Sequence, residues 1–88
     1  MAWTIELSTS AERTLKKLDR QTAARIADFI DSRLNGTDDP RRVGKALHAT
    51  LKDFWSYRVG DYRLICELRD ARVVILVVEI GHRSGIYR

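Results

Sequence analysis

The stretch FWSYRVGDYR, residues 54–63, predicts a β-hairpin around which the rest of the fold is arranged. Its central Gly60-Asp61 dipeptide suits a two-residue hairpin turn. A turn closed there places Arg58 directly opposite Arg63 on the neighbouring strand. The residues that alternate with these arginines form an apolar face that helices can cover: Trp55, Tyr57, Val59, Tyr62, Leu64, Cys66 and Leu68. The hairpin therefore has one apolar face and one cationic face.

The two facing arginines predict an anion-binding site. Like charges directly opposite on a sheet are destabilising. The only acid between Arg58 and Arg63 in the sequence is Asp61, which belongs to the predicted turn rather than to either strand. An anion held between the two guanidinium groups explains the pair. The alternative is that both arginines are solvated on an open sheet face.

Residues before the hairpin predict a strand followed by two helices. Residues 3–7 alternate apolar and polar side chains, which indicates a half-buried strand. Ser8, Thr9 or Ser10 can cap a first helix, whose apolar residues follow at helical spacing. Asp19 suits the N-cap of a second helix that ends at Asn35-Gly36. Asp39-Pro40 is typical of a short helical turn before the hairpin.

Strand periodicity continues to the C-terminal part. The strands are expected at residues 53–59, 62–69 and 72–80, with a tight turn at Asp70-Ala71. We predict a single α+β domain over residues 1–88. An N-terminal strand is followed by two antiparallel helices packed on an antiparallel sheet, in the order β-α-α-β-β-β.

Charge is unevenly distributed over the 88 residues, whose formal net charge is +4. Residues 1–40 carry six lysines and arginines against seven acids, whereas residues 41–88 carry ten against five. This asymmetry favours a polyanionic partner for the second half, most commonly a nucleic acid, although acidic proteins also bind basic surfaces.

Cysteine content and leader signals favour a cytoplasmic protein. The single cysteine, Cys66, cannot form an internal disulfide and is expected in the core. The first residues show no basic leader followed by an apolar stretch. The longest apolar run, residues 73–78, is too short to span a bilayer.

The C-terminal stretch GHRSGIYR, residues 81–88, carries groups that suit phosphate chemistry. Arginines cannot serve as a general base, so Arg83 can bind or stabilise the phosphate but cannot accept the proton. Tyr87 is the best candidate base, because neighbouring positive charge lowers a tyrosine pKa from about 10. His82 is the next candidate and His48 a weaker one. Tyr87 packing the chain end and His82 in a structural role are the alternatives.

No metal or cofactor is predicted. Asp38-Asp39 and Asp53 form no convincing carboxylate cluster, and the sequence has no phosphate-cradling glycine loop. Arginines plus one base suffice for cleaving RNA, because the ribose 2′-hydroxyl is a built-in nucleophile that DNA lacks. RNA is therefore the expected substrate.

These motifs resemble the RelE/ParE superfamily of bacterial toxin–antitoxin toxins over essentially the whole chain. The matching pieces are Leu47, Leu51-Lys52, the string WSYRVGDYR at 55–63, and GHR at 81–83 with Tyr87. The resemblance implies a cognate antitoxin (RelB-like) as partner. In the RelE branch it also implies a metal-independent endonuclease that cuts mRNA in the decoding site of the ribosome and so arrests translation.

The resemblance also implies roles for individual residues. Arg58 and Arg63 would hold the scissile phosphate, Arg83 would stabilise or protonate the leaving oxygen, and Tyr87 would act as the base or its orienter. Many relatives carry a basic residue where this chain has Ser56, so that strand offers no lysine as base. Lys52 would supply some of the missing charge, and RNA contacts are expected from Lys52, Ser56 and His82.

Two other functions remain open. A ParE-like toxin would inhibit DNA gyrase by binding, without chemistry of its own. An inactive RNA- or ribosome-binding module would bind without cleaving, with Ser56 marking a lost catalytic strand.

Overall fold

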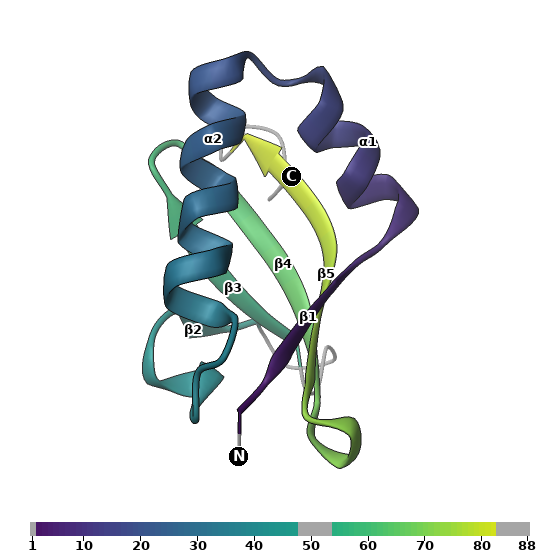
Figure 1. Cartoon of the computed structure of the whole chain (residues 1–88), viewed down its shortest axis with the longest axis vertical. Coiled ribbons are helices and arrows are strands. Elements are labelled where there is room, and N and C mark those ends of the chain that lie inside the picture. Colours follow the sequence, from purple (N-terminus) through teal and green to yellow (C-terminus); the bar gives the residue numbers. More distant parts are fainter. Residues whose placement is uncertain (1, 48–53, 83–88) are drawn as a thin grey trace.

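A mixed five-stranded sheet carries two helices on one of its faces (Figure 1). The computed structural model describes residues 2–47 and 54–82. The strand order across the sheet is β1-β5-β4-β3-β2. The strands are β1 (Thr4–Leu7), β2 (Lys45–Ala46), β3 (Phe54–Val59), β4 (Tyr62–Arg69) and β5 (Val74–His82). This arrangement confirms the predicted α+β class.

The helical part consists of α1 (Thr9–Lys17) and α2 (Arg20–Phe29), which continues through a π-helical turn at Ile30–Leu34. The chain ascends through α1 and descends through α2, so the two helices run in opposite directions as predicted (Figure 1). Short 3₁₀ turns follow at Pro40–Arg42 and Asp70–Arg72. The first of these confirms the helical turn predicted at Asp39-Pro40.

Side-chain caps fix where the two helices begin. The Ser8 hydroxyl accepts a hydrogen bond from the Ala11 amide and donates one to the Val78 carbonyl, which ties the start of α1 to β5. The Asp19 carboxylate caps α2 by accepting from the Thr22 amide at 3.1 Å. Hydrogen bonds from Thr22 hold the pKa of Asp19 below its usual range. Both starts agree with the sequence signals.

The hairpin has the predicted register. Val59 pairs with Tyr62 and Arg58 with Arg63 across the Gly60-Asp61 turn. Gly60 has a φ of +60°, which glycine adopts without steric cost at the first central position of a tight hairpin turn.

Three features of the sheet differ from the prediction. β1 pairs with β5 in parallel, because alternation of side chains marks a strand but carries no information about the direction of its neighbour. The two-residue strand β2 was not predicted, since two residues are too few to show a period. The last strand begins at Val74 and ends at His82, after a 3₁₀ turn rather than a two-residue turn.

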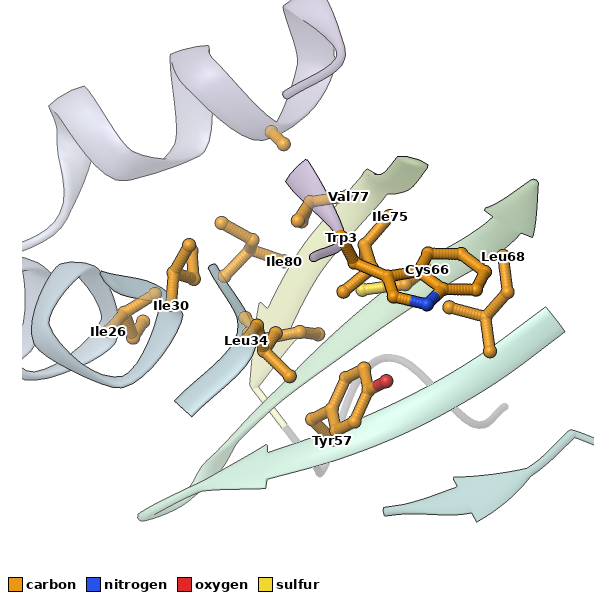
Figure 2. Packing of buried hydrophobic residues seen from close by; sticks show 12 residues of the cluster. Trp3, Ile26, Ile30, Leu34, Tyr57, Cys66, Leu68, Ile75, Val77 and Ile80 are labelled. Atoms are coloured by element: carbon orange, nitrogen blue, oxygen red, sulfur yellow. The ribbon is translucent and has the colours of Figure 1, made fainter. Parts of the chain in front are cut away.

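The core lies between the helices and the sheet (Figure 2). Ile26, Ile30 and Leu34 face the predicted apolar side of the hairpin strands, where Tyr57 and Leu64 are almost fully buried. Cys66 is also fully buried, and burial raises the pKa of its thiol to about 12. The thiol therefore stays protonated at neutral pH, which fits its predicted place in the core. None of the helices within residues 2–47 and 54–82 is long and apolar enough to cross a membrane.

Candidate functional site

A groove of about 670 Å³ lies along β3, next to the short strand β2 that pairs with β3 at the edge of the sheet. It combines positive charge with apolar surface. The basic lining residues are Arg33, Lys45, Arg58 and Arg63. The others are Phe29, Val43, Gly44, Ala46, Leu47, Ser56 and Tyr57. No acidic residue lines the groove within the described part of the chain, so an anion fits its charge.

The two arginines predicted to face one another do so. Directly opposite residues on neighbouring antiparallel strands have Cβ atoms about 4.5–5.5 Å apart, and Arg58 and Arg63 are such a pair. The Arg58 side chain is exposed and donates through Nε to the Gly60 carbonyl at 3.1 Å. Arg63 is half-buried, and its Nη1 is shielded from solvent. The turn carbonyl thus helps to fix the direction of the Arg58 side chain.

Arg58 lacks the acidic partner that Arg41, Arg42, Arg69 and Arg72 have. Over residues 2–47 and 54–82, no carboxylate forms an ion pair with it. By contrast, Arg41 makes two 2.9 Å hydrogen bonds to Asp70, and Arg69 lies 2.8 Å from Glu67. The positive charge of Arg58 therefore remains available to a ligand in the groove.

The segment before β2 is fixed to β3 by two side-chain hydrogen bonds. The Trp55 indole donates to the Val43 carbonyl at 2.7 Å, and the Tyr57 hydroxyl donates to the Pro40 carbonyl at 2.6 Å. Burial raises the pKa of Tyr57, so its phenol remains a protonated donor rather than a base. These bonds give one wall of the groove a defined position.

Gly44 lets the same segment approach β3 closely. Its φ is +79°, and a Cβ at this position would lie 2.5 Å from the Ser56 carbonyl oxygen and 2.7 Å from the Tyr57 ring. No real side chain tolerates such distances without a shift of the backbone. The next residue, Lys45, pairs with Ser56 in the β2–β3 ladder.

Ser56 lies in the same groove as the arginine pair, whereas His82 does not line that groove. Ser56 is 7% exposed and lines the groove. His82 pairs with Tyr62, whereas the neighbouring Arg63 pairs with Gly81, so the histidine and the arginine lie on opposite faces of the sheet. The His82 ring contacts the Tyr62 ring edge-on, with centroids 5.4 Å apart.

The remaining predicted site residues lie outside the described residues. Lys52, Arg83 and Tyr87 belong to residues 48–53 and 83–88, as does the weaker candidate His48. Their proposed roles stay predictions. A metal site is not indicated within residues 2–47 and 54–82, which contain no group of three or more potential metal ligands.

Among the charged and aromatic residues of the groove, sequence reasoning missed Lys45, Phe29 and Arg33. Lys45 belongs to a strand too short to be recognised. Phe29 and Arg33 are four residues apart on the helical segment, and the Arg33 guanidinium lies 5.8 Å from the centre of the Phe29 ring. That i, i+4 spacing of an aromatic and a cation was a usable signal.

Comparison with known proteins identifies the family. The model described as "ParE toxin of type II toxin-antitoxin system, parDE" matches residues 5–87. The chain belongs to this toxin family. The toxin is 34% identical to Toxin RelG of Mycobacterium tuberculosis over 100% of this chain and 99% of that protein. It is 31% identical to Toxin RelE of the same organism, over 96% of this chain and 84% of that protein.

Solved structures agree with the fold. The toxin–antitoxin complex RelBE2 from M. tuberculosis contains a chain with a TM-score of 0.82 and 30% identity, covering 97% of this toxin and 95% of that chain. A variant of E. coli toxin RelE in the free state gives a TM-score of 0.76 at 19% identity, covering 98% and 88%. At that identity the second match supports the fold alone. The expected membership of the RelE/ParE superfamily is confirmed.

Proposed function

We propose that the toxin is a metal-independent endonuclease that cleaves mRNA, with the ribosome presenting the message. The observation that carries this proposal is the groove in which Arg58 faces Arg63 while no carboxylate among the described residues pairs with Arg58. Two guanidinium groups from adjacent strands suit bidentate binding of one phosphodiester. The similarity to proteins named RelG and RelE also favours the RelE branch.

The proposed reaction uses the RNA's own nucleophile. The ribose 2′-oxygen attacks the adjacent phosphorus, the bond to the 5′-oxygen of the next nucleotide breaks, and a 2′,3′-cyclic phosphate forms. A base accepts the 2′-hydroxyl proton, and the departing 5′-oxygen receives a proton. Negative charge grows on the non-bridging oxygens, where Arg58 and Arg63 stabilise it. One such preorganised donor is typically worth roughly a hundred- to a thousandfold in rate.

The C-terminal stretch supplies the other two catalytic groups in this proposal. Arg83 stabilises or protonates the leaving oxygen, and Tyr87 acts as the base or orients it. Both roles rest on the family resemblance. Ser56 and Lys52 contact the RNA beside the scissile linkage. His82 is assigned only a peripheral RNA contact, because it lies on the sheet face opposite Arg63.

A cognate antitoxin is the proposed regulatory partner. A related structure is a toxin–antitoxin complex with 30% identity to this chain. A groove with four basic residues and several apolar ones suits a segment that presents acidic and apolar side chains. Such a segment would exclude RNA while it occupies the groove.

Inhibition of DNA gyrase by binding is the alternative function, and the description of the matching family model favours it. Pulse-labelling of protein and DNA synthesis after induction separates the two. Message cleavage stops protein synthesis first, whereas gyrase inhibition stops DNA synthesis and induces the DNA-damage response. Early arrest of DNA synthesis with intact messages would overturn the nuclease proposal.

Mapping of message 5′ ends after induction tests cleavage directly. New 5′ ends within coding regions are expected for the natural toxin and not for Arg63→Ala, which should still fold and bind the antitoxin. Arg72→Ala is the matched control, because Arg72 lies near Glu6 at the opposite end of the sheet. A folded Arg63→Ala variant that still produces the new ends would contradict the proposed role of Arg63.

A further inference from the structure

We propose that Lys45 is a third phosphate-binding residue, which holds the phosphate next to the linkage clamped by Arg58 and Arg63. This inference rests on the proposed function and extends it to how the toxin holds its RNA. Lys45 is exposed, lies on β2 and lines the same groove as the two arginines.

The strand register places Lys45 on the cationic face. Lys45 pairs with Ser56, and residues paired across neighbouring strands project from the same face. Arg58 follows Ser56 by two residues, so it shares that face and is the diagonal neighbour of Lys45. Diagonal neighbours lie roughly 7–8 Å apart, within reach of long side chains. The three basic residues thus form a row across β2, β3 and β4.

Ser56 is small and uncharged, so it supplies no positive charge to the groove next to Arg58. Lys45, which pairs with Ser56, is the basic residue at that point. Ser56 is 7% exposed and carries no charge. Its cross-strand partner therefore supplies the positive charge at this point of the groove. In the part of the chain that the structure describes, no carboxylate forms an ion pair with Lys45.

The position of Lys45 is defined by its neighbours in the chain. Gly44 lies against the Ser56 carbonyl and the Tyr57 ring, and the Trp55 indole holds the Val43 carbonyl. A residue held in place pays less ordering entropy when a ligand binds than one on a free loop. The backbone that carries Lys45 is therefore held in a defined position beside the groove.

A row of cations suits a chain of regularly spaced anions. Placing three basic side chains together is unfavourable unless a polyanion neutralises them, and successive RNA phosphates do so one by one. Lysine binds phosphate as a point charge, without the bidentate geometry of arginine. Lys45 therefore strengthens RNA binding, whereas the arginine pair acts on the reacting phosphate.

The test compares Lys45→Ala with Lys16→Ala, which removes an exposed lysine from α1. α1 packs on β5 and β1, at the other edge of the sheet from β2. Binding of antitoxin-free toxin to a short single-stranded RNA is measured as a function of salt, and single-turnover cleavage is measured in a reconstituted translation system. Circular dichroism confirms that each variant is folded.

We expect Lys45→Ala to weaken RNA binding roughly tenfold, as for loss of one hydrogen bond to a charged group. The slope of log affinity against log salt should fall by about 0.7, the value for one phosphate contact on a single strand. The half-saturating RNA concentration should rise while the cleavage rate at saturation stays near that of the natural toxin. Lys45→Arg should restore binding.

Three results would overturn this assignment. If the natural toxin cleaves RNA and Lys45→Ala behaves like Lys16→Ala, the proposed role of Lys45 is wrong. The nuclease proposal is not affected by that result. Weakened antitoxin binding with unchanged RNA binding assigns Lys45 to the antitoxin interface instead. Natural toxin that neither binds nor cleaves RNA removes the proposed function and, with it, the role of Lys45.

Discussion

The arginines at the two ends of the sheet differ in whether they pair with carboxylates. At the β4–β5 turn, Arg41 is bound by Asp70, Arg69 by Glu67, and Arg72 lies 4.0 Å from Glu6. At the β3–β4 hairpin, Arg58 faces Arg63 and has no acidic partner among residues 2–47 and 54–82. Figure 1 shows these two turns at opposite ends of the sheet.

The comparison teaches that a basic composition does not by itself locate a binding site. Both ends belong to the strongly basic second half of the chain. Carboxylates at the β4–β5 end cancel the local positive potential, whereas the groove beside β3 retains its positive potential.

The largest effect is expected for the facing arginines. Arg58→Ala and Arg63→Ala should each lower the single-turnover cleavage rate roughly a hundred- to a thousandfold, because each removes a donor to the developing phosphate charge. The double variant should lose less than the product of the two, since both act on one phosphate. Rates are measured at saturating message.

The control for this prediction is Arg72→Ala in the β4–β5 turn, with a cleavage rate expected to stay within about twofold of the natural toxin. Equal losses in Arg72→Ala and Arg58→Ala would erase the contrast between the two ends.

The next effect concerns the wall of the groove. Gly44→Ala should lower the free energy of unfolding by about 2–5 kcal/mol, since left-handed backbone costs an alanine about 1–2 kcal/mol and the clash with Ser56 adds overpacking. RNA binding should fall as well, because β2 must shift. Denaturant unfolding measures the stability.

Gly36→Ala is the matched control for Gly44→Ala. Gly36 has a similar φ of +84°, but a Cβ there would meet nothing within 4 Å. It should therefore lose only the backbone contribution of about 1–2 kcal/mol. Equal losses at both glycines would show that close packing of β2 on β3 is unimportant.

A smaller effect is expected from the buried hydrogen bond that holds the same wall. Tyr57→Phe removes the donor to the Pro40 carbonyl and should lower the free energy of unfolding by about 1–3 kcal/mol. Tyr62→Phe serves as control, because the Tyr62 hydroxyl makes no hydrogen bond within the described residues. A larger loss in Tyr62→Phe would argue against the Pro40 contact.

The smallest effect is expected where charge is already paired. The Arg41 guanidinium lowers the pKa of Asp70, so the pair stabilises the protein above the ordinary carboxyl pKa of about 3.9 and loses that contribution as pH falls further. Both side chains are partly exposed, so Asp70→Asn should cost less than about 1 kcal/mol at neutral pH. Unfolding measured from pH 7 down to pH 2 should bring the two proteins together in acid.

Cleavage by Asp70→Asn should match the natural toxin, because Asp70 lies in the β4–β5 turn and does not line the groove. A large loss of activity in this variant would contradict the division of the sheet into a neutralised end and a binding end.

Local signals in the sequence were sufficient for the hairpin and the helix starts. The register of Arg58 with Arg63 follows from one dipeptide and from the two-residue period of a strand, and the caps at Ser8 and Asp19 involve residues only three positions apart. Burial of Cys66 follows from its place on the apolar face. These features depend on short-range chemistry, which is written in the order of the residues.

Long-range pairing was decided only by the tertiary structure. The parallel contact of β1 with β5, the approach of Lys45 to Ser56 and the ion pair between Arg41 and Asp70 join residues 11 to 70 positions apart. A sequence pattern gives no direction or distance for such contacts, because many arrangements satisfy the same alternation of apolar and polar residues. Packing selects one of them, and that choice left Arg58 and Lys45 without carboxylates among the described residues while it neutralised Arg41.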